Sequence, residues 1–87
     1  MNINELWDKL IDYEGKEFHT KTGLPFSYEA LDDKVIISRN GKKYHANEKD
    51  FLLVLNNPKK DRYFYRDNMR VSSYVLGIMS DPRIGAI

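Results

Sequence analysis

Apolar and polar residues alternate along the middle of the chain, between residues 26 and 46. Such alternation is typical of strands that bury one face, because successive side chains point to opposite sides of a sheet. Two pairs of turn-forming residues interrupt the alternation, Asp32-Asp33 and Asn40-Gly41. The Asn-Gly pair readily adopts the positive φ angles of a two-residue type I′ turn. We therefore predict a three-stranded antiparallel meander.

The two turns also predict the register of the strands. Closure at residues 40–41 places Ile37 opposite Tyr44, and closure at residues 32–33 places Tyr28 opposite Ile37. One face of the sheet then carries Phe26, Tyr28, Ala30, Val35, Ile37, Tyr44 and Ala46. The other face carries Ser27, Glu29, Ile36, Ser38, Lys43 and His45, with Lys34 at its edge. Two independent turns thus agree on one apolar and one mainly polar face.

Helical spacing of apolar residues predicts three helices around this sheet, each bounded by a capping residue and a helix breaker. They lie between Asn2 and Gly15, between Asn47 and Pro58, and between Ser72 or Ser73 and Pro82. A further short strand is expected at residues 17–20. The predicted fold class is α+β, a small three- to four-stranded antiparallel meander with two to three helices packed on one face. The length of 87 residues allows one domain, residues 1–87.

Residues 59–71 form a basic and aromatic segment. Tyr63 and Tyr65 alternate with charged or apolar neighbours, which suits a short strand followed by a turn at Asp67-Asn68. The segment carries the cations Lys59, Lys60, Arg62, Arg66 and Arg70. Cations neutralise phosphates and tyrosines stack on unpaired bases, so the segment is a candidate nucleic-acid surface. In the alternative interpretation the tyrosines pack in the core, and the cations face water or pair with the acidic first helix.

Charge is distributed unevenly along the chain. Residues 1–33 hold eight acidic and three basic residues, a net charge of −5, whereas residues 34–87 hold five acidic and eleven basic residues, a net charge of +6. The second half includes Arg39, Lys42 and Lys43 at the predicted hairpin turn. A three-stranded sheet can enter a DNA groove through one face, although Glu29 on the same face would repel phosphate. The alternative is a solvated sheet face with no ligand.

Two smaller sets of residues complete the candidates for chemistry. Arg70, Ser72 and Ser73 precede the last helix, whose first amides favour an anion, although a serine at this position needs no ligand to explain it. The only histidines are His19 and His45, which we expect on strands. A catalytic role for either would require a carboxylate within hydrogen-bond reach.

The sequence predicts neither an enzyme nor a cofactor or metal site. Cysteine is absent, so disulfides and thiolate metal ligands are excluded. Paired metal-ligand spacings, a G-x-S-x-G turn and a glycine-rich phosphate loop are also absent. The N-terminal residues lack the order of a signal peptide, and no apolar run approaches the roughly 20 residues that span a bilayer. We expect a cytoplasmic protein without membrane contact.

A protein-partner surface is the main alternative to nucleic-acid binding. Leu31 and Ile36 are apolar positions on the otherwise polar side of the sheet, and Ile84 and Ile87 lie in the C-terminal tail. Uncovered apolar groups of this kind mark interfaces. The strand at residues 17–20, if it lies at a sheet edge, offers a place for a partner strand. This hypothesis describes an adaptor or a homodimer.

The stretch from Lys16 to Arg39, with Leu24-Pro25-Phe26 near its centre, resembles small bacterial or phage-encoded domains. Residues 26–57, a three-stranded meander followed by a helix, are similar in outline to the sheet-type DNA-binding domains of phage-like integrases. The likeness is architectural and transfers no functional residue. The leading hypothesis is a non-enzymatic module that binds nucleic acid or another phosphate-rich partner. Its candidate residues are Arg39, Lys42, Lys43, Lys59, Lys60, Arg62, Tyr63, Tyr65, Arg66 and Arg70.

Overall fold

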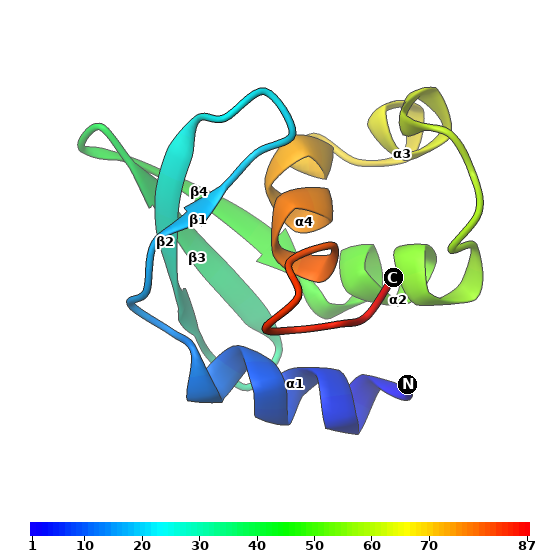
Figure 1. The fold of residues 1–87 in the computed structure, drawn as a ribbon, viewed down its shortest axis with the longest axis horizontal. Coiled ribbons are helices and arrows are strands. Elements are labelled where there is room, and N and C mark those ends of the chain that lie inside the picture. Colours follow the sequence, from blue (N-terminus) through cyan, green and yellow to red (C-terminus); the bar gives the residue numbers. More distant parts are fainter.

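The computed structural model describes residues 1–87 as four helices and one four-stranded sheet. The elements, in chain order, are α1 (Ile3–Asp12), β1 (Phe18–His19), β2 (Pro25–Ala30), β3 (Lys34–Arg39), β4 (Lys42–Asn47), α2 (Glu48–Asn56), α3 (Arg62–Asn68) and α4 (Ser72–Met79). The strands follow one another in the order β1-β2-β3-β4, and each pairs with its neighbour antiparallel. Figure 1 shows α2 and α4 on one side of the sheet and α1 across its end. The predicted α+β class is confirmed, with one helix more than the two to three expected.

The predicted registers of the meander are confirmed. Tyr28 pairs with Ile37, and Ile37 pairs with Tyr44. At the turn between β3 and β4, Asn40 and Gly41 both have positive φ, 51° and 78°, as a type I′ turn requires. The residues of the predicted apolar face are buried or half-buried beneath the helices.

Two aromatic side chains attach α1 to the sheet. The hydroxyl of Tyr28 donates to the carbonyl oxygen of Leu10 at 2.6 Å, and Trp7 Nε1 donates to the carbonyl oxygen of Leu31 at 2.6 Å. Burial raises the pKa of the Tyr28 hydroxyl above its usual range, so it remains a donor. The ring of Trp7 also packs edge-on against Phe51 of α2, with centroids 5.4 Å apart. The helix α1 is thereby joined both to the sheet and to the helix α2.

The prediction of a strand within residues 59–71 is wrong, since these residues contain α3. Asp61 Oδ1 accepts hydrogen bonds from the amides of Tyr63 and Phe64, at 3.0 and 3.1 Å, and so caps the helix. Helical spacing turns Tyr65 inward, where it is 2% exposed, and leaves Tyr63 outside at 49%. The predicted turn at residues 67–68 falls in the last residues of this helix.

The start of α4 also differs from the expectation. Val71 occupies the capping position, and no side chain caps the helix. Ser72 is therefore the first residue inside the helix rather than its cap. None of the four helices has the length and apolar composition that crossing a membrane requires.

The helix α4 lies very close to β1. A Cβ atom on Gly77 would be 2.6 Å from the carbonyl oxygen of His19 and 3.3 Å from Cα of Thr20. Only glycine fits this contact without a shift of the backbone. The strand expected at residues 17–20 is thus present at the sheet edge, as Phe18–His19, and α4 lies against it.

Candidate functional site

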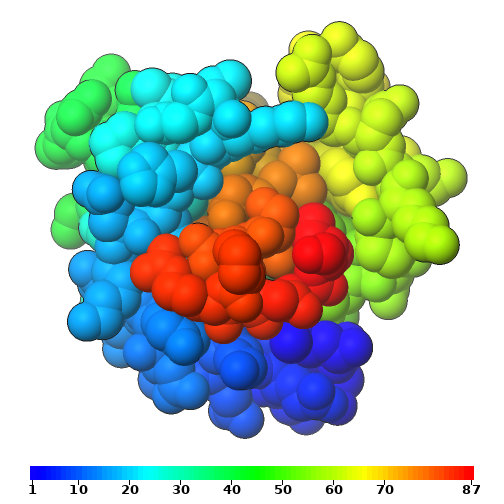
Figure 2. Space-filling model, viewed as in Figure 1, coloured from blue at the N-terminus to red at the C-terminus, as the bar shows by residue number.

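A groove with a volume of about 790 Å³ opens between the loop that joins β1 to β2, the helices α3 and α4, and the end of the chain. Figure 2 shows this hollow between the cyan loop, the yellow α3 and the red C-terminal residues, with the orange α4 behind it. Most of its lining residues are polar or charged. The lining consists of His19, Thr20, Lys21, Thr22, Arg62, Tyr63, Arg66, Ser72, Ser73, Leu76, Gly77, Ser80, Asp81 and Ile87. Segments distant in the sequence therefore form one concave surface.

The cations of the groove come from two opposite walls. Lys21 lies in the loop between β1 and β2, while Arg62 and Arg66 belong to α3. Both arginines lie next to the ring of Tyr63, with guanidinium carbons 5.2 and 4.8 Å from its centroid. Arg62 Nη2 also donates to the Tyr63 hydroxyl at 3.4 Å, and this hydrogen bond raises the pKa of the Arg62 guanidinium. The α3 wall therefore presents an exposed aromatic ring beside two permanent positive charges.

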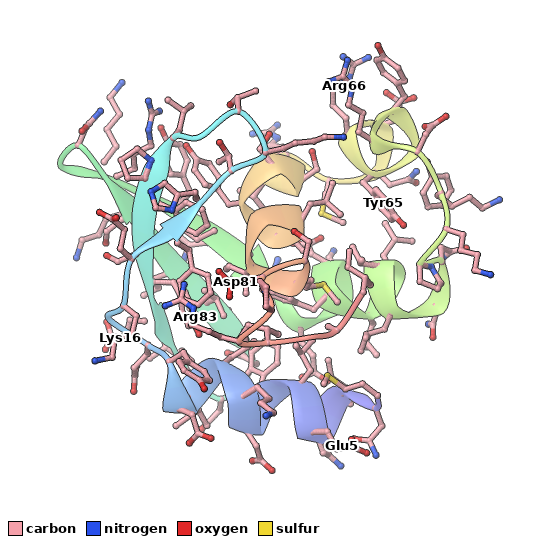
Figure 3. The ribbon with its side chains drawn as sticks, in the orientation of Figure 1. Glu5, Lys16, Tyr65, Arg66, Asp81 and Arg83 are labelled. Atoms are coloured by element: carbon pink, nitrogen blue, oxygen red, sulfur yellow. The ribbon has the colours of Figure 1, made fainter.

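The only acidic side chain that lines the groove is Asp81, and Arg83 neutralises it. Arg83 Nε and Nη2 donate to the two carboxylate oxygens of Asp81, each at 3.0 Å. These hydrogen bonds lower the pKa of Asp81. Arg83 Nη2 also donates to the carbonyl oxygen of Glu17 at 2.8 Å, which ties the C-terminal turn to the segment before β1. Figure 3 shows Asp81 and Arg83 side by side below α4. The groove consequently retains its positive charge.

Hydroxyl groups and an apolar area make up the rest of the groove. Ser72 and Ser73 lie at the start of α4, and Ser80 lies at its end. Leu76 of α4 and Ile87 supply apolar surface between them, and Ile87 is 44% exposed. The arrangement offers donors for an anion beside an apolar area on which a flat group can lie.

The structure divides the ten predicted residues into separate groups. Arg62, Tyr63 and Arg66 line the groove. The remaining candidates lie outside it: Arg39, Lys42 and Lys43 on the β3–β4 hairpin, Lys59 and Lys60 in the loop before α3, Arg70 after α3, and Tyr65 in the core. In Figure 1 the β3–β4 hairpin and α3 lie on opposite sides of the molecule, so these basic groups do not form one surface.

Tyr65 is a structural residue. Its side chain is buried, and its hydroxyl donates to the carbonyl oxygen of Asn57 at the end of α2. Figure 3 shows the Tyr65 ring pointing from α3 toward the interior, whereas Arg66 points outward. The candidate surface therefore excludes Tyr65, which is unavailable for stacking on a base.

Neither histidine lies in a buried acid–base arrangement. His19 Nε2 is 3.4 Å from a carboxylate oxygen of Glu17, and both side chains are more than half exposed. His45 is exposed on β4, opposite Ile36 of β3. No group of three or more histidine or acidic side chains gathers closely enough to hold a metal ion.

One wall of the groove is formed by residues that were not predicted as site residues. Thr20 was expected only at the end of a short strand, and no binding role was predicted for Lys21 or Thr22, yet all three residues face α3 and α4 across the groove. Thr20 Oγ1 accepts from the amide of Leu24 at 3.1 Å and lies 3.1 Å from Thr22 Oγ1, which fixes the loop. No local pattern predicts this contact, because it joins residues some forty positions apart in the sequence.

Comparison with known proteins adds no relative to this description. Neither a protein-family model, nor a curated protein, nor a solved structure matches this chain.

Proposed function

We propose that this protein is a non-enzymatic module that binds single-stranded nucleic acid in the groove between α3, α4 and the β1–β2 loop. The observation that carries the proposal is the pairing of an exposed tyrosine with cations on both walls. Tyr63 offers a face for base stacking, and Lys21 and Arg66 offer charge to phosphates. The one carboxylate of the lining, Asp81, is already held by Arg83 and adds little repulsion.

The size of the groove favours a single strand over a duplex. The whole molecule measures 30 × 25 × 22 Å, so it is not much wider than a DNA double helix. A groove of about 790 Å³ lies within the range of sites that enclose small molecules. Such a hollow accommodates one or two nucleotides with their bases unstacked. The flat polar face of the sheet lies elsewhere and is not required.

A binding measurement with matched charge variants tests the proposal. A fluorescently labelled oligothymidylate at low salt should bind the protein with a steep salt dependence. Replacing both Arg62 and Arg66 by alanine should weaken binding about tenfold or more, because two phosphate-neutralising cations are lost. The control replaces Lys9 of α1 and Lys49 of α2 by alanine, which makes the same change in net charge outside the groove.

Two outcomes would overturn the proposal. One is the absence of binding to any single-stranded oligonucleotide at low salt. The other is equal weakening by the Arg62/Arg66 and Lys9/Lys49 double variants, because binding would then depend on net charge alone and not on the groove. A matched double-stranded oligonucleotide that binds more tightly than the single strand would contradict the preference for unpaired bases.

The protein-partner hypothesis finds less support in the arrangement of apolar residues. Ile84 is buried in the core, Leu31 and Ile36 are half-buried, and Ile87 lies in the groove. These residues do not form one continuous exposed surface. Sedimentation velocity over a range of concentrations tests the homodimer form of this hypothesis, and a concentration-dependent dimer would revive it.

A further inference from the structure

We infer that the start of α4, with the hydroxyl of Ser72, holds one phosphate group of the ligand in this groove. The inference rests on the proposed function for the larger ligand, and it assigns a specific subsite within the groove. It concerns a single chemical group, a phosphate, whether that group belongs to a strand end or to its backbone.

The first observation is that α4 begins without a cap. Val71 has no side-chain oxygen, and no other side chain accepts a hydrogen bond at this end of the helix. The first backbone hydrogen bonds of the helix run from the amides of Tyr74 and Val75 to the carbonyl oxygen of Val71, each at 3.0 Å. The amides of Ser72 and Ser73 precede these hydrogen bonds in the chain, and the first amides of a helix have no acceptor within the helix. The helix dipole adds a partial positive charge at the same point.

The second observation is independent of the helix and concerns the side chain of Ser72. This residue is 7% exposed and lines the groove, yet its hydroxyl has no hydrogen-bond partner within the protein. Thr20 is equally buried, but its hydroxyl accepts from Leu24 and contacts Thr22. No buried side-chain nitrogen or oxygen of the protein lacks a hydrogen-bond partner, so the unpaired Ser72 hydroxyl is open to the groove. A group that enters the groove can therefore accept its hydrogen bond.

The surroundings of Ser72 select a negatively charged acceptor. Lys21 and Arg66 line the same groove, and Asp81 is engaged by Arg83. Ser73 adds a second, exposed hydroxyl at the same end of α4. A phosphate group can accept several hydrogen bonds at once from hydroxyls, amides and guanidinium groups. A neutral carbonyl would satisfy Ser72 but would not neutralise the charge of Lys21 and Arg66.

The test follows inorganic phosphate by amide NMR, with sodium chloride adjusted to keep the ionic strength constant. We expect saturable shifts at the amides of Ser72 and Ser73. The variant Ser72→Ala should bind phosphate about tenfold more weakly, because a hydrogen bond to a charged group is lost. The matched control is Ser38→Ala on β3, outside the groove. No hydrogen-bond donor of the groove is lost in this variant, so binding should change less than about twofold.

A second variant separates phosphate binding from folding. Ser73→Asp places a negative charge in the first turn of α4, which favours the helix through its dipole but repels a phosphate. The variant should unfold at the same temperature as the original protein or higher, and it should lose phosphate binding. Shifts that do not saturate, or equal phosphate affinity in Ser72→Ala and the original protein, would overturn the subsite.

Oligothymidylates with and without a 5′-phosphate show whether the bound phosphate belongs to a strand end or to the backbone. They also test the phosphate subsite separately from the proposed binding of single-stranded nucleic acid. If Ser72→Ala removes a preference for the phosphorylated strand, the subsite takes a strand end. If it weakens both strands equally, the subsite takes a backbone phosphate. Oligonucleotide binding that is unaffected by Ser72→Ala would overturn the subsite and leave the proposed function standing. Phosphate binding without oligonucleotide binding would overturn the proposed function and leave the subsite.

Discussion

The absence of a side chain at Gly77 allows α4 to approach the sheet closely. A glycine inside a helix costs about 1 kcal/mol relative to alanine when nothing else depends on it. Here the gap between α4 and the carbonyl oxygen of His19 has no room for a methyl group, since a Cβ would lie 2.6 Å away. The position of α4, and with it the floor of the groove, depends on this residue.

The variant Gly77→Ala should therefore destabilise the protein, although alanine is the better helix former. Steric overlap with backbone atoms should outweigh the gain in helix propensity and leave a net cost of about 1–3 kcal/mol in the free energy of unfolding. Urea denaturation measures this change. The control Ser73→Ala, at an exposed position of the same helix, should change stability by less than about 0.5 kcal/mol. A Gly77→Ala protein as stable as its parent would show that α4 can move away from β1.

The carboxylate of Asp81 makes the C-terminal turn sensitive to acid. Hydrogen bonds from Arg83 lower the pKa of Asp81 in the folded protein below its value in the unfolded chain. The unfolded state thus binds the proton more readily, and the stabilisation is lost as pH falls below about 4. Thermal unfolding between pH 6 and pH 2 should show a smaller loss of stability for Asp81→Asn than for the original protein. Asp8→Asn, an exposed acid on α1, should retain the original acid dependence.

The helix α3 differs from the strand that its sequence suggests. Arg62, Tyr63, Phe64 and Tyr65 alternate in a manner that suits a strand, and aromatic residues favour strands. The decisive residue is Asp61, which precedes them and caps a helix. This seven-residue helix buries Tyr65 against Asn57 and exposes Tyr63. Neither a helical nor a strand repeat of apolar residues predicts which tyrosine is buried, because the burial depends on the neighbouring α2.

The cap at Asp61 gives a prediction for α3. Asp61→Ala removes the acceptor for two backbone amides and should cost about 1 kcal/mol of stability. It should also weaken oligonucleotide binding, because Arg62, Tyr63 and Arg66 are no longer held in one wall. The control Asp67→Ala makes the same change in charge near the end of α3, where an acid is unfavourable, so stability should stay equal or rise. Urea denaturation and fluorescence titration measure both effects, and equal behaviour of the two variants would contradict the role of the cap.

The meander, in contrast, was predictable in detail. Its registers follow from two local turns, and both turns depend on residues adjacent in sequence. The groove was not predictable, because Lys21 and Arg66 approach one another only after α4 has docked against β1. Local chemistry determines the elements, whereas the site depends on packing between distant segments.

Charge separates across the whole molecule. In Figure 3, Glu5 on α1 and Arg66 on α3 lie at opposite ends of the view. A second, smaller groove beside α1 is lined by Asp8, Asp32 and Glu48, so it is acidic where the first is basic. The uneven charge of the sequence thus corresponds to acidic and basic surfaces on different sides of the molecule. We expect a polyanion to approach from the α3 side.

Salt dependence distinguishes the groove from the basic segment of the sequence. Lys21→Ala and Arg66→Ala should each lower the slope of log K against log salt by roughly 0.7, the value for one phosphate on a single strand. Lys59→Ala should leave the slope nearer its original value, because this lysine belongs to the basic segment but not to the groove. Oligonucleotide titrations over a range of salt concentrations measure the three slopes. A larger effect at Lys59 than at Lys21 would place the ligand along the segment instead.

The close contact between α4 and β1 also bears on edge-to-edge association of the sheet with a second molecule. An open sheet edge can recruit a strand from another chain and start aggregation. At β1 only two residues pair with β2, and α4 lies against the carbonyl group of His19. The other edge, β4, begins with Lys42 and Lys43, whose charges repel the same strand of a second molecule. The glycine that brings α4 to the sheet therefore also protects one of its two edges from edge-to-edge association.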